Sequence, residues 1–214
     1  TVPSAWKGKQ VKLNFGAVDW KADVFVNDIL IGSHQGGFTP FSFDITPYLS
    51  GKGEQKLVVR VWDPTEKGYQ PIGKQTSRPE GIWYTSVTGI WQTVWIEPVA
   101  VNHVTAVKAI PDIDKEVVDV TVSAAKCCVA DYAEVTLFDG GKQVSVAKGV
   151  TGKALRLAVK SPKLWSPESP ALYTMKISLY SAGKKIDEVS SYTAMRKIST
   201  KRDANGIMRM QLNN

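Results

Sequence analysis

The chain has 214 residues, of which 43% are hydrophobic and 22% are charged, and its formal net charge at pH 7 is +7. This length allows two domains of ordinary size, and the composition is that of a folded globular protein. The 27 lysine and arginine residues are scattered and form no basic stripe interleaved with aromatic side chains, so nucleic acid is not a predicted partner. No apolar run reaches membrane-spanning length, so no membrane partner is predicted either.

The two cysteines of the chain, Cys127 and Cys128, are adjacent. Neighbouring cysteines cannot form the ordinary disulfide that closes a long loop, so we expect one buried and one exposed thiol and infer no compartment from them. His34 and His103 lie far apart, and without a cluster of ligands the sequence predicts neither a metal site nor a cofactor. The chain begins at Thr1, which we interpret as processing or excision, and a secreted or periplasmic location is consistent with a removed signal.

The first quarter of the chain has the alternating pattern of β-strands. Its apolar positions, spaced two residues apart, are Val11, Leu13, Phe15, Ala22, Val24 and Val26. Asn27-Asp28 predicts a hairpin turn, because both residue types tolerate the left-handed backbone. Gly36-Gly37 predicts a second turn beside which Phe38 packs. His34 and Gln35 are expected to be exposed next to it, where they are candidate contact residues, although we favour a structural role for them.

Residues 57–62 and the segment that follows them have contrasting patterns. Leu57 to Trp62 are apolar on both faces apart from Arg60, which predicts a central strand. From Asp63 to Ile82, prolines and glycines interrupt every pattern, and loops of such length are usually functional or disordered. The seven tryptophans of the chain are expected mainly in the core, whereas exposed ones would suit stacking on the apolar face of a sugar.

The second half of the chain has short alternating segments with a turn about every 8–12 residues. Their apolar positions are Val118, Val120, Val122, Val135, Leu137, Leu155, Leu157, Val159, Tyr173, Met175, Ile177 and Leu179. This pattern is typical of an immunoglobulin-like sandwich, although the disulfide and tryptophan of antibody domains are missing. No stretch has a sustained helical period, so the predicted fold class is all-β.

Three segments resemble, in the same order, parts of glycoside hydrolase family 2. AVDWKADVFVN and GSHQGGFTPFSFDIT, within residues 17–46, are similar to the N-terminal sugar-binding domain of that family. GIWQTVWIEP at 89–98 resembles the last strand of that domain, and LWSPE at 164–168 resembles the immunoglobulin-like domain that follows. The family includes β-galactosidases, β-glucuronidases and β-mannosidases.

The resemblance implies a chain in three parts. A jelly-roll-like β-sandwich would occupy residues 1–98 and lack its first strands, and an immunoglobulin-like β-sandwich would occupy 99–198. Residues 199–214 would begin the linker to a catalytic (β/α)8 barrel that the chain does not contain. Sheet edges left open by missing strands would favour a homo-oligomer.

The resemblance also implies that the chemistry lies outside the chain. Retaining glycoside hydrolysis needs two carboxylates about 5 Å apart, which the family supplies from the barrel. We therefore predict no catalytic residue and no activity for the chain alone, and a β-galactosidase-like parent enzyme whose partners are carbohydrate and its own barrel. Asp19 and Asp23 are expected to pair with nearby lysines.

The predicted sugar-contacting segment is the loop from Tyr69 to Tyr84. Planar polar groups and an aromatic platform bind sugars, and the loop offers Lys74, Gln75, Arg78, Glu80 and Trp83. The alternative is that the charges are solvated and Trp83 belongs to the core, which we favour for Trp83 because tryptophan is usually well buried. Some family members carry an acidic residue where Gly81 stands here, so the resemblance implies no metal or hydroxyl contact at that position.

Two other functions fit the same sequence. One is a stand-alone carbohydrate-binding module, and the other is a structural or adhesive β-sandwich protein. Galactoside binding separates the first from the front portion of an enzyme, because half of the enzyme's site would be absent and binding would be weak. The sequence leaves the sugar and its linkage open.

Overall fold

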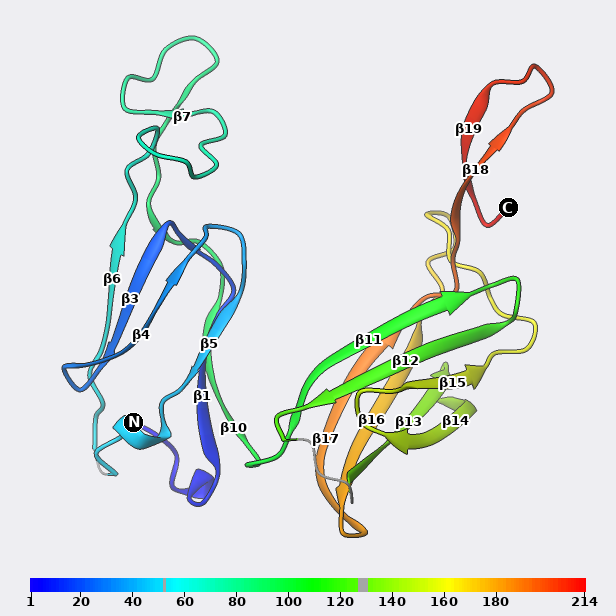
Figure 1. The fold of residues 1–214 in the computed structure, drawn as a ribbon, viewed down its shortest axis with the longest axis horizontal. Coiled ribbons are helices and arrows are strands. Elements are labelled where there is room, and N and C mark those ends of the chain that lie inside the picture. The colour runs from blue at the N-terminus through cyan, green and yellow to red at the C-terminus, as the bar shows by residue number, and fades with distance from the viewer. Residues whose placement is uncertain (52, 127–130) are drawn as a thin grey trace. The chain divides into compact units, whose positions relative to one another are not determined.

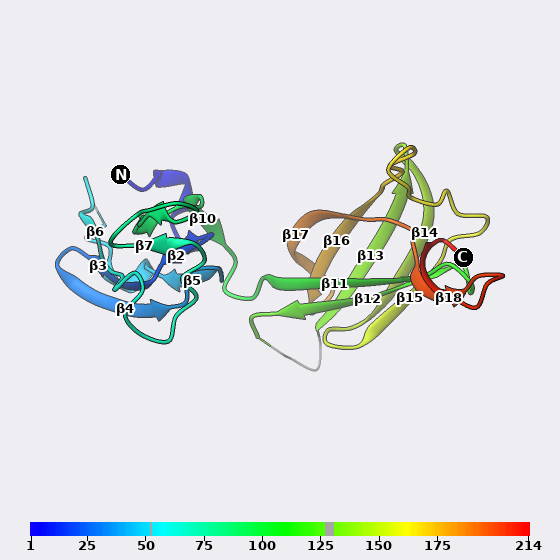
Figure 2. The same ribbon diagram turned by 90° about the horizontal axis from the view of Figure 1, so that it is seen from above.

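The computed structural model describes residues 1–51, 53–126 and 131–214, so the prediction for Cys127 and Cys128 lies outside the described residues. The chain divides into two compact units, Thr1–Val99 and Ala100–Asn214. Both units are built from β-strands, as Figure 1 and Figure 2 show. The all-β fold class is confirmed.

The first unit has two three-stranded antiparallel sheets, ordered β10-β1-β5 and β4-β3-β6. Two short pairs, β2-β9 and the parallel β7-β8, extend it. Its elements are η1 (Ser4–Trp6), β1 (Gln10–Phe15), β2 (Val18–Asp19), β3 (Lys21–Val26), β4 (Ile29–Gln35), β5 (Phe41–Asp44), η2 (Thr46–Tyr48), β6 (Leu57–Trp62), β7 (Gln75–Thr76), β8 (Tyr84–Thr85), β9 (Gly89–Ile90) and β10 (Val94–Val99).

The core of the first unit follows the alternation of the sequence. The apolar residues of β1 and β3 are buried together in one cluster, which also contains Val18 and Ile45. The turn between β3 and β4 is formed by Asn27 and Asp28, whose φ angles of 48° and 66° lie in the left-handed region. The predicted turn pair is thereby confirmed.

The prediction that residues 57–62 form a central strand is wrong. β6 ends its sheet and pairs with β3, and Leu57 and Trp62 are 46% and 59% exposed. Apolar residues on both faces indicate a strand covered on both sides, but here the outer side is open. The sequence pattern shows that the side chains are apolar, but it does not show whether another part of the fold covers them.

The tryptophans also differ from the prediction that most belong to the core. All seven lie among the described residues, and none is buried. Four of them, Trp62, Trp83, Trp91 and Trp95, are exposed. The two small sheets of the first unit bury valine, leucine and phenylalanine, and its large indole rings lie around that core.

The second unit is an immunoglobulin-like sandwich of two antiparallel sheets, ordered β11-β12-β15 and β14-β13-β16-β17. The alternating residues of β12, β13, β15 and β16 meet in one buried cluster between the sheets. Its elements are β11 (Val104–Asp112), β12 (Val117–Ala124), β13 (Asp131–Asp139), β14 (Lys142–Val150), β15 (Ala154–Ala158), β16 (Tyr173–Ser181), β17 (Lys184–Thr193), β18 (Ile198–Arg202) and β19 (Met208–Leu212).

Charged side chains on the outer faces of the second unit are paired across strands. Lys148 reaches Glu134 at 2.6 Å, and Arg156 reaches Asp119 at 2.8 Å. Glu188 is reached from the neighbouring strand by Lys176 at 3.2 Å and accepts a hydrogen bond from Ser178 at 3.0 Å. The backbone N–H of Trp165 donates to the carbonyl oxygen of Met195 at 2.9 Å.

The last residues form a two-stranded hairpin, β18-β19, where the resemblance predicts the start of a linker. The turn is organised by Asp203, whose Oδ1 accepts the N–H groups of Asn205 and Ile207 at 2.9 Å. The register places Thr200 opposite Met210 on one face. Met210 is 80% exposed.

Candidate functional site

The long connection between β6 and β9 is an ordered excursion that contains β7 and β8. Gln70 is 8% exposed, and its Nε2 donates to the carbonyl oxygen of Thr65 at 3.0 Å. Across the base of the excursion, the N–H of Ser77 donates to Glu66 at 2.9 Å. Buried and charge-assisted hydrogen bonds therefore hold a segment that has little apolar core of its own.

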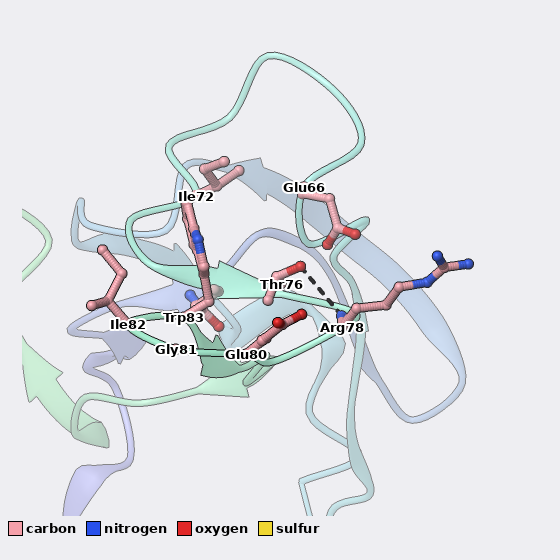
Figure 3. A pocket seen from close by; sticks show the side chains of 9 residues that line it. Glu66, Ile72, Thr76, Arg78, Glu80, Gly81, Ile82 and Trp83 are labelled. Atoms are coloured by element: carbon pink, nitrogen blue, oxygen red, sulfur yellow. Dashed lines mark hydrogen bonds between the residues drawn. The ribbon is translucent and has the colours of Figure 1, made fainter.

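Four of the five predicted sugar-contacting residues line one cavity of about 600 Å³ in this excursion. Its lining, shown in Figure 3, consists of Glu66, Ile72, Gln75, Thr76, Arg78, Glu80, Gly81, Ile82 and Trp83. The fifth residue, Lys74, does not line this cavity. It is exposed, and its carbonyl oxygen accepts the N–H of Tyr84 at 2.8 Å.

The expectation that Trp83 belongs to the core is wrong, because its side chain is 45% exposed. The ring stands at the wall of the cavity near Ile72, whereas the guanidinium of Arg78 points away from it (Figure 3). The excursion is too thin to bury an indole, so a residue type that is usually buried lies at its surface.

The acidic residues of this cavity have different surroundings. The hydroxyl of Ser77 donates to Glu66, and this hydrogen bond is the main reason that the pKa of Glu66 lies below its ordinary value. Glu66 therefore holds the excursion together. Within the described part of the chain, the carboxylate of Glu80 has no hydrogen bond or ion pair, which leaves it open to a ligand.

A second cavity of about 340 Å³ shares Gln75 with the first. Its volume falls in the range of about 300–1,000 Å³ that is ordinary for small-molecule sites. The lining consists of Asp19, Phe38, Gln75, Val87, Thr88, Gly89, Ile90 and Trp91. Gln75 lines both cavities, and its Oε1 accepts the N–H of Val87 at 2.6 Å.

Two aromatic rings form one wall of the second cavity. Phe38 and Trp91 meet edge to face with their ring centroids 5.8 Å apart, and they are 65% and 53% exposed. The indole N–H of Trp91 donates to the carbonyl oxygen of Gly37 at 2.7 Å, which fixes the ring. Phe38 packs as the sequence predicts, but its contact is with a ring that is itself at the surface.

Asp19 supplies the carboxylate of the second cavity. Partial burial, and secondarily the nearby charge of Asp63, raise the pKa of Asp19 above its ordinary value. The absence of a side chain at Gly37 makes room for it, because a Cβ there would lie 2.5 Å from Asp19 Oδ1. Among the described residues, no hydrogen-bond donor or cation contacts this carboxylate.

The neighbouring carboxylate of Asp63 is occupied. It accepts the backbone N–H of Thr65 at 2.8 Å and the hydroxyl of Thr88 at 3.1 Å. Asp63 is not part of the cavity's lining, so it shapes the loop and the field around Asp19. It does not offer the second reacting carboxylate that glycoside hydrolysis needs.

The prediction that Asp19 and Asp23 pair with lysines is corrected for both residues. Asp23 accepts from Arg60 at 2.6 Å and from Ser33, and its pKa lies below the ordinary value because of these hydrogen bonds. Asp19 has no such partner in the described structure. The sequence contained one indication of this site, an acidic residue directly before a tryptophan, which we interpreted as structural.

His34 has the structural surroundings that the sequence predicts, but it is half-buried and not exposed. Its ring stacks on Phe41 with the centroids 4.1 Å apart, and Nε2 lies 3.1 Å from the hydroxyl of Thr39. In the parts of the chain that the structure describes, no group of three or more acidic, histidine or cysteine side chains is arranged to hold a metal ion. Nor does any described helix have the length and apolar character needed to cross a bilayer.

Comparison with known families identifies both units. Residues 1–98 match the model described as "Glycosyl hydrolases family 2, sugar binding domain", and residues 102–196 match the model "Glycosyl hydrolases family 2". The chain belongs to glycosyl hydrolases family 2. The resemblance of the three sequence segments is thereby confirmed.

Curated family 2 proteins are similar along almost the whole chain. A β-galactosidase of Thermoanaerobacter pseudethanolicus is 27% identical over 94% of the chain and 28% of its own length. A β-glucuronidase of Bacteroides fragilis is 29% identical over 92% of the chain and 30% of its own length. The chain therefore spans less than a third of either of these family 2 relatives.

Solved structures of the same family share the fold. A β-glucuronidase from Ruminococcus gnavus in complex with uronic isofagomine superposes over the whole chain, with a TM-score of 0.80, 21% identity and 36% of that protein covered. A β-glucuronidase from Lactobacillus rhamnosus superposes with a TM-score of 0.75 and 25% identity, again over the whole chain and 36% of that protein.

Proposed function

We propose that this chain is the non-catalytic front portion of a family 2 glycoside hydrolase, which supports hydrolysis of O-glycosidic bonds in β-galactosides or related sugars. The observation that carries the proposal is the second cavity, where the Asp19 carboxylate has no donor among the described residues and shares the lining with exposed aromatic rings. Sugar hydroxyls supply such donors, and the apolar face of a sugar ring fits an aromatic wall.

The parts of the chain take different roles in this proposal. Residues 1–98 carry the sugar contacts and residues 99–198 form an immunoglobulin-like spacer, whereas residues 199–214 lead toward a barrel that supplies the two catalytic carboxylates. At the first cavity, Gln75, Glu80 and Trp83 contact the sugar, because these side chains line it. Arg78 lines it with its guanidinium turned away, and Lys74 lies outside it.

Nuclear magnetic resonance of the 214-residue chain tests the proposal. Titration with methyl β-D-galactoside should shift the indole N–H signals of Trp91 and Trp83 with a dissociation constant of about 1 mM or weaker, since half of the site is absent. The indole signal of Trp165 in the second unit serves as the internal control. The same preparation should not hydrolyse a nitrophenyl β-galactoside.

Two results would contradict the proposal. Hydrolysis by the purified chain, above a blank, would place catalytic residues within it. The absence of any shift at Trp91 and Trp83 with every sugar tried would remove the sugar-contacting role. A dissociation constant near or below about 1 µM would instead favour a stand-alone carbohydrate-binding module.

A further inference from the structure

Relatives of this chain include both β-galactosidases and β-glucuronidases, whose substrates differ in charge at the sugar ring. We propose that Asp19 makes the second cavity select neutral sugars and reject uronates. This inference rests on the proposed sugar-contacting function and deepens it, because it names the class of sugar that the front domain accepts.

The charged groups at the second cavity are all negative. Of its eight lining residues, Asp19 alone is ionisable, and the next carboxylate, that of Asp63, is close enough to act on it. Asp63 keeps its charge in place through its hydrogen bonds with Thr65 and Thr88. No lysine or arginine lies among the lining residues to balance the two carboxylates.

The adjoining first cavity does not change this balance. Its ionisable lining residues are Glu66, Glu80 and Arg78. The guanidinium of Arg78 extends away from the other lining side chains (Figure 3), and Glu80 has no cationic partner among the described residues. A uronate that lies along Gln75 therefore meets carboxylates on both sides.

A like charge in this position is costly because the cavity is partly shielded from water. Charges at a protein surface that lie within about 5 Å of each other, at an effective dielectric constant of about 20, repel by more than the energy of a tenfold change in affinity. Asp19 is already an ionised group that its surroundings disfavour. A second carboxylate on the ligand would add to this repulsion, whereas a neutral ligand would not.

A neutral sugar meets favourable partners at the same atoms. Its hydroxyl groups donate to the Asp19 carboxylate, and hydrogen bonds to a charged acceptor contribute more than those to neutral ones. One ring face lies against Phe38 and Trp91, whose edge-to-face contact and indole hydrogen bond hold them in place. The same carboxylate thus attracts hydroxyl groups and repels a uronate.

A pair of ligands of nearly the same shape, one charged and one neutral, tests the inference on the 214-residue chain. Methyl β-D-glucuronide and its uronamide have the same shape, and each is titrated at low salt near neutral pH while the Trp91 indole signal is followed. We expect the uronamide to bind roughly tenfold more tightly than the uronate. In the Asp19→Asn variant this ratio should fall toward one.

Asp28→Asn is the matched control, because it removes the same charge from an exposed turn outside both cavities. It should leave the ratio unchanged. Equal binding of the two ligands by the unaltered chain, or a ratio that survives Asp19→Asn, would overturn the inference while the sugar-contacting function stands. Binding of neither ligand, nor of methyl β-D-galactoside, would overturn both.

Discussion

The two units of this chain are both built from β-strands, but they differ in which side chains they bury and pair. In the second unit, the alternating residues of both sheets are buried together, and the outer charges are paired across strands. In the first unit, tryptophan rings such as those of Trp62 and Trp91 are exposed, and Asp19 has no partner within the described structure. Under the proposed function, the comparison indicates that a ligand-binding domain leaves groups unsatisfied that a supporting domain satisfies internally.

The pKa values of two carboxyl groups, one in each unit, show this difference between the units. Lys185, then Lys176 and Ser178, lower the pKa of Glu188 in the second unit to about 2. Burial and the charge of Asp63 raise the pKa of Asp19 in the first unit. The folded second unit thus favours its charged carboxylate, whereas the folded first unit disfavours its own.

The largest expected effect is on the free energy of unfolding, when one buried leucine in each unit is replaced by alanine. Leu137 is fully buried in the second unit, and Leu13 is 1% exposed in the first, where it also lines a cleft of about 130 Å³. We expect Leu137→Ala to lower the free energy of unfolding by about 3–4 kcal/mol and Leu13→Ala by about 2–3 kcal/mol, because an open cleft relaxes more easily than a closed core.

Hydrogen exchange followed by mass spectrometry reads the stability of each unit separately from its own peptides. It therefore avoids treating the chain as a single two-state system. A loss in the first unit equal to or larger than the loss in the second would break the comparison, since the two cores would then be equally closed.

A smaller effect is expected at Glu188. Because the pKa of the Glu188 carboxyl is lower in the folded state, its ionised form stabilises the second unit. This stabilisation is fully present above the ordinary pKa of 4.5 and is lost as the pH falls toward about 2. Glu188→Gln should therefore lower the stability of the second unit near neutral pH and have no effect near pH 2. The exposed Glu168→Gln is the control. An equal loss at both pH values would show that packing, and not charge, is responsible.

The smallest effect has the opposite sign and lies at Asp19. Burial and the charge of Asp63 raise the pKa of Asp19, so the ionised form of Asp19 destabilises the folded first unit. This destabilisation grows as the pH rises above the ordinary pKa of 3.8. Asp19→Asn should stabilise this unit near neutral pH by no more than about 1 kcal/mol after solvent screening. The gain should vanish below pH 3.8. A loss of stability near neutral pH would mean that the carboxylate has a structural partner.

The sequence revealed those features that depend on neighbours along the chain. The alternation of Val118, Val120 and Val122 identified a buried strand face, and Asn27-Asp28 identified a turn, because each pattern acts within a few residues. The loop that contains Gln75 and Trp83 was found from the failure of any pattern across it.

The features that the sequence did not reveal depend on contacts across the fold. The second cavity joins Asp19, Phe38, Gln75 and Trp91, which come from four separate segments, and no local pattern marks their meeting. The open side of β6 is likewise a property of the sheet. Its apolar residues alone do not indicate whether another strand covers them.

The position of Gln75 has a consequence for redesign. Gln75 is a lining residue of both cavities, of about 600 and 340 Å³, so a smaller residue at this position would change the lining of both. The same change would leave the N–H of Val87 without its acceptor, Gln75 Oε1, and loosen the backbone that lines the second cavity. Gln75 therefore affects both the shape of the cavities and the rigidity of the backbone around them.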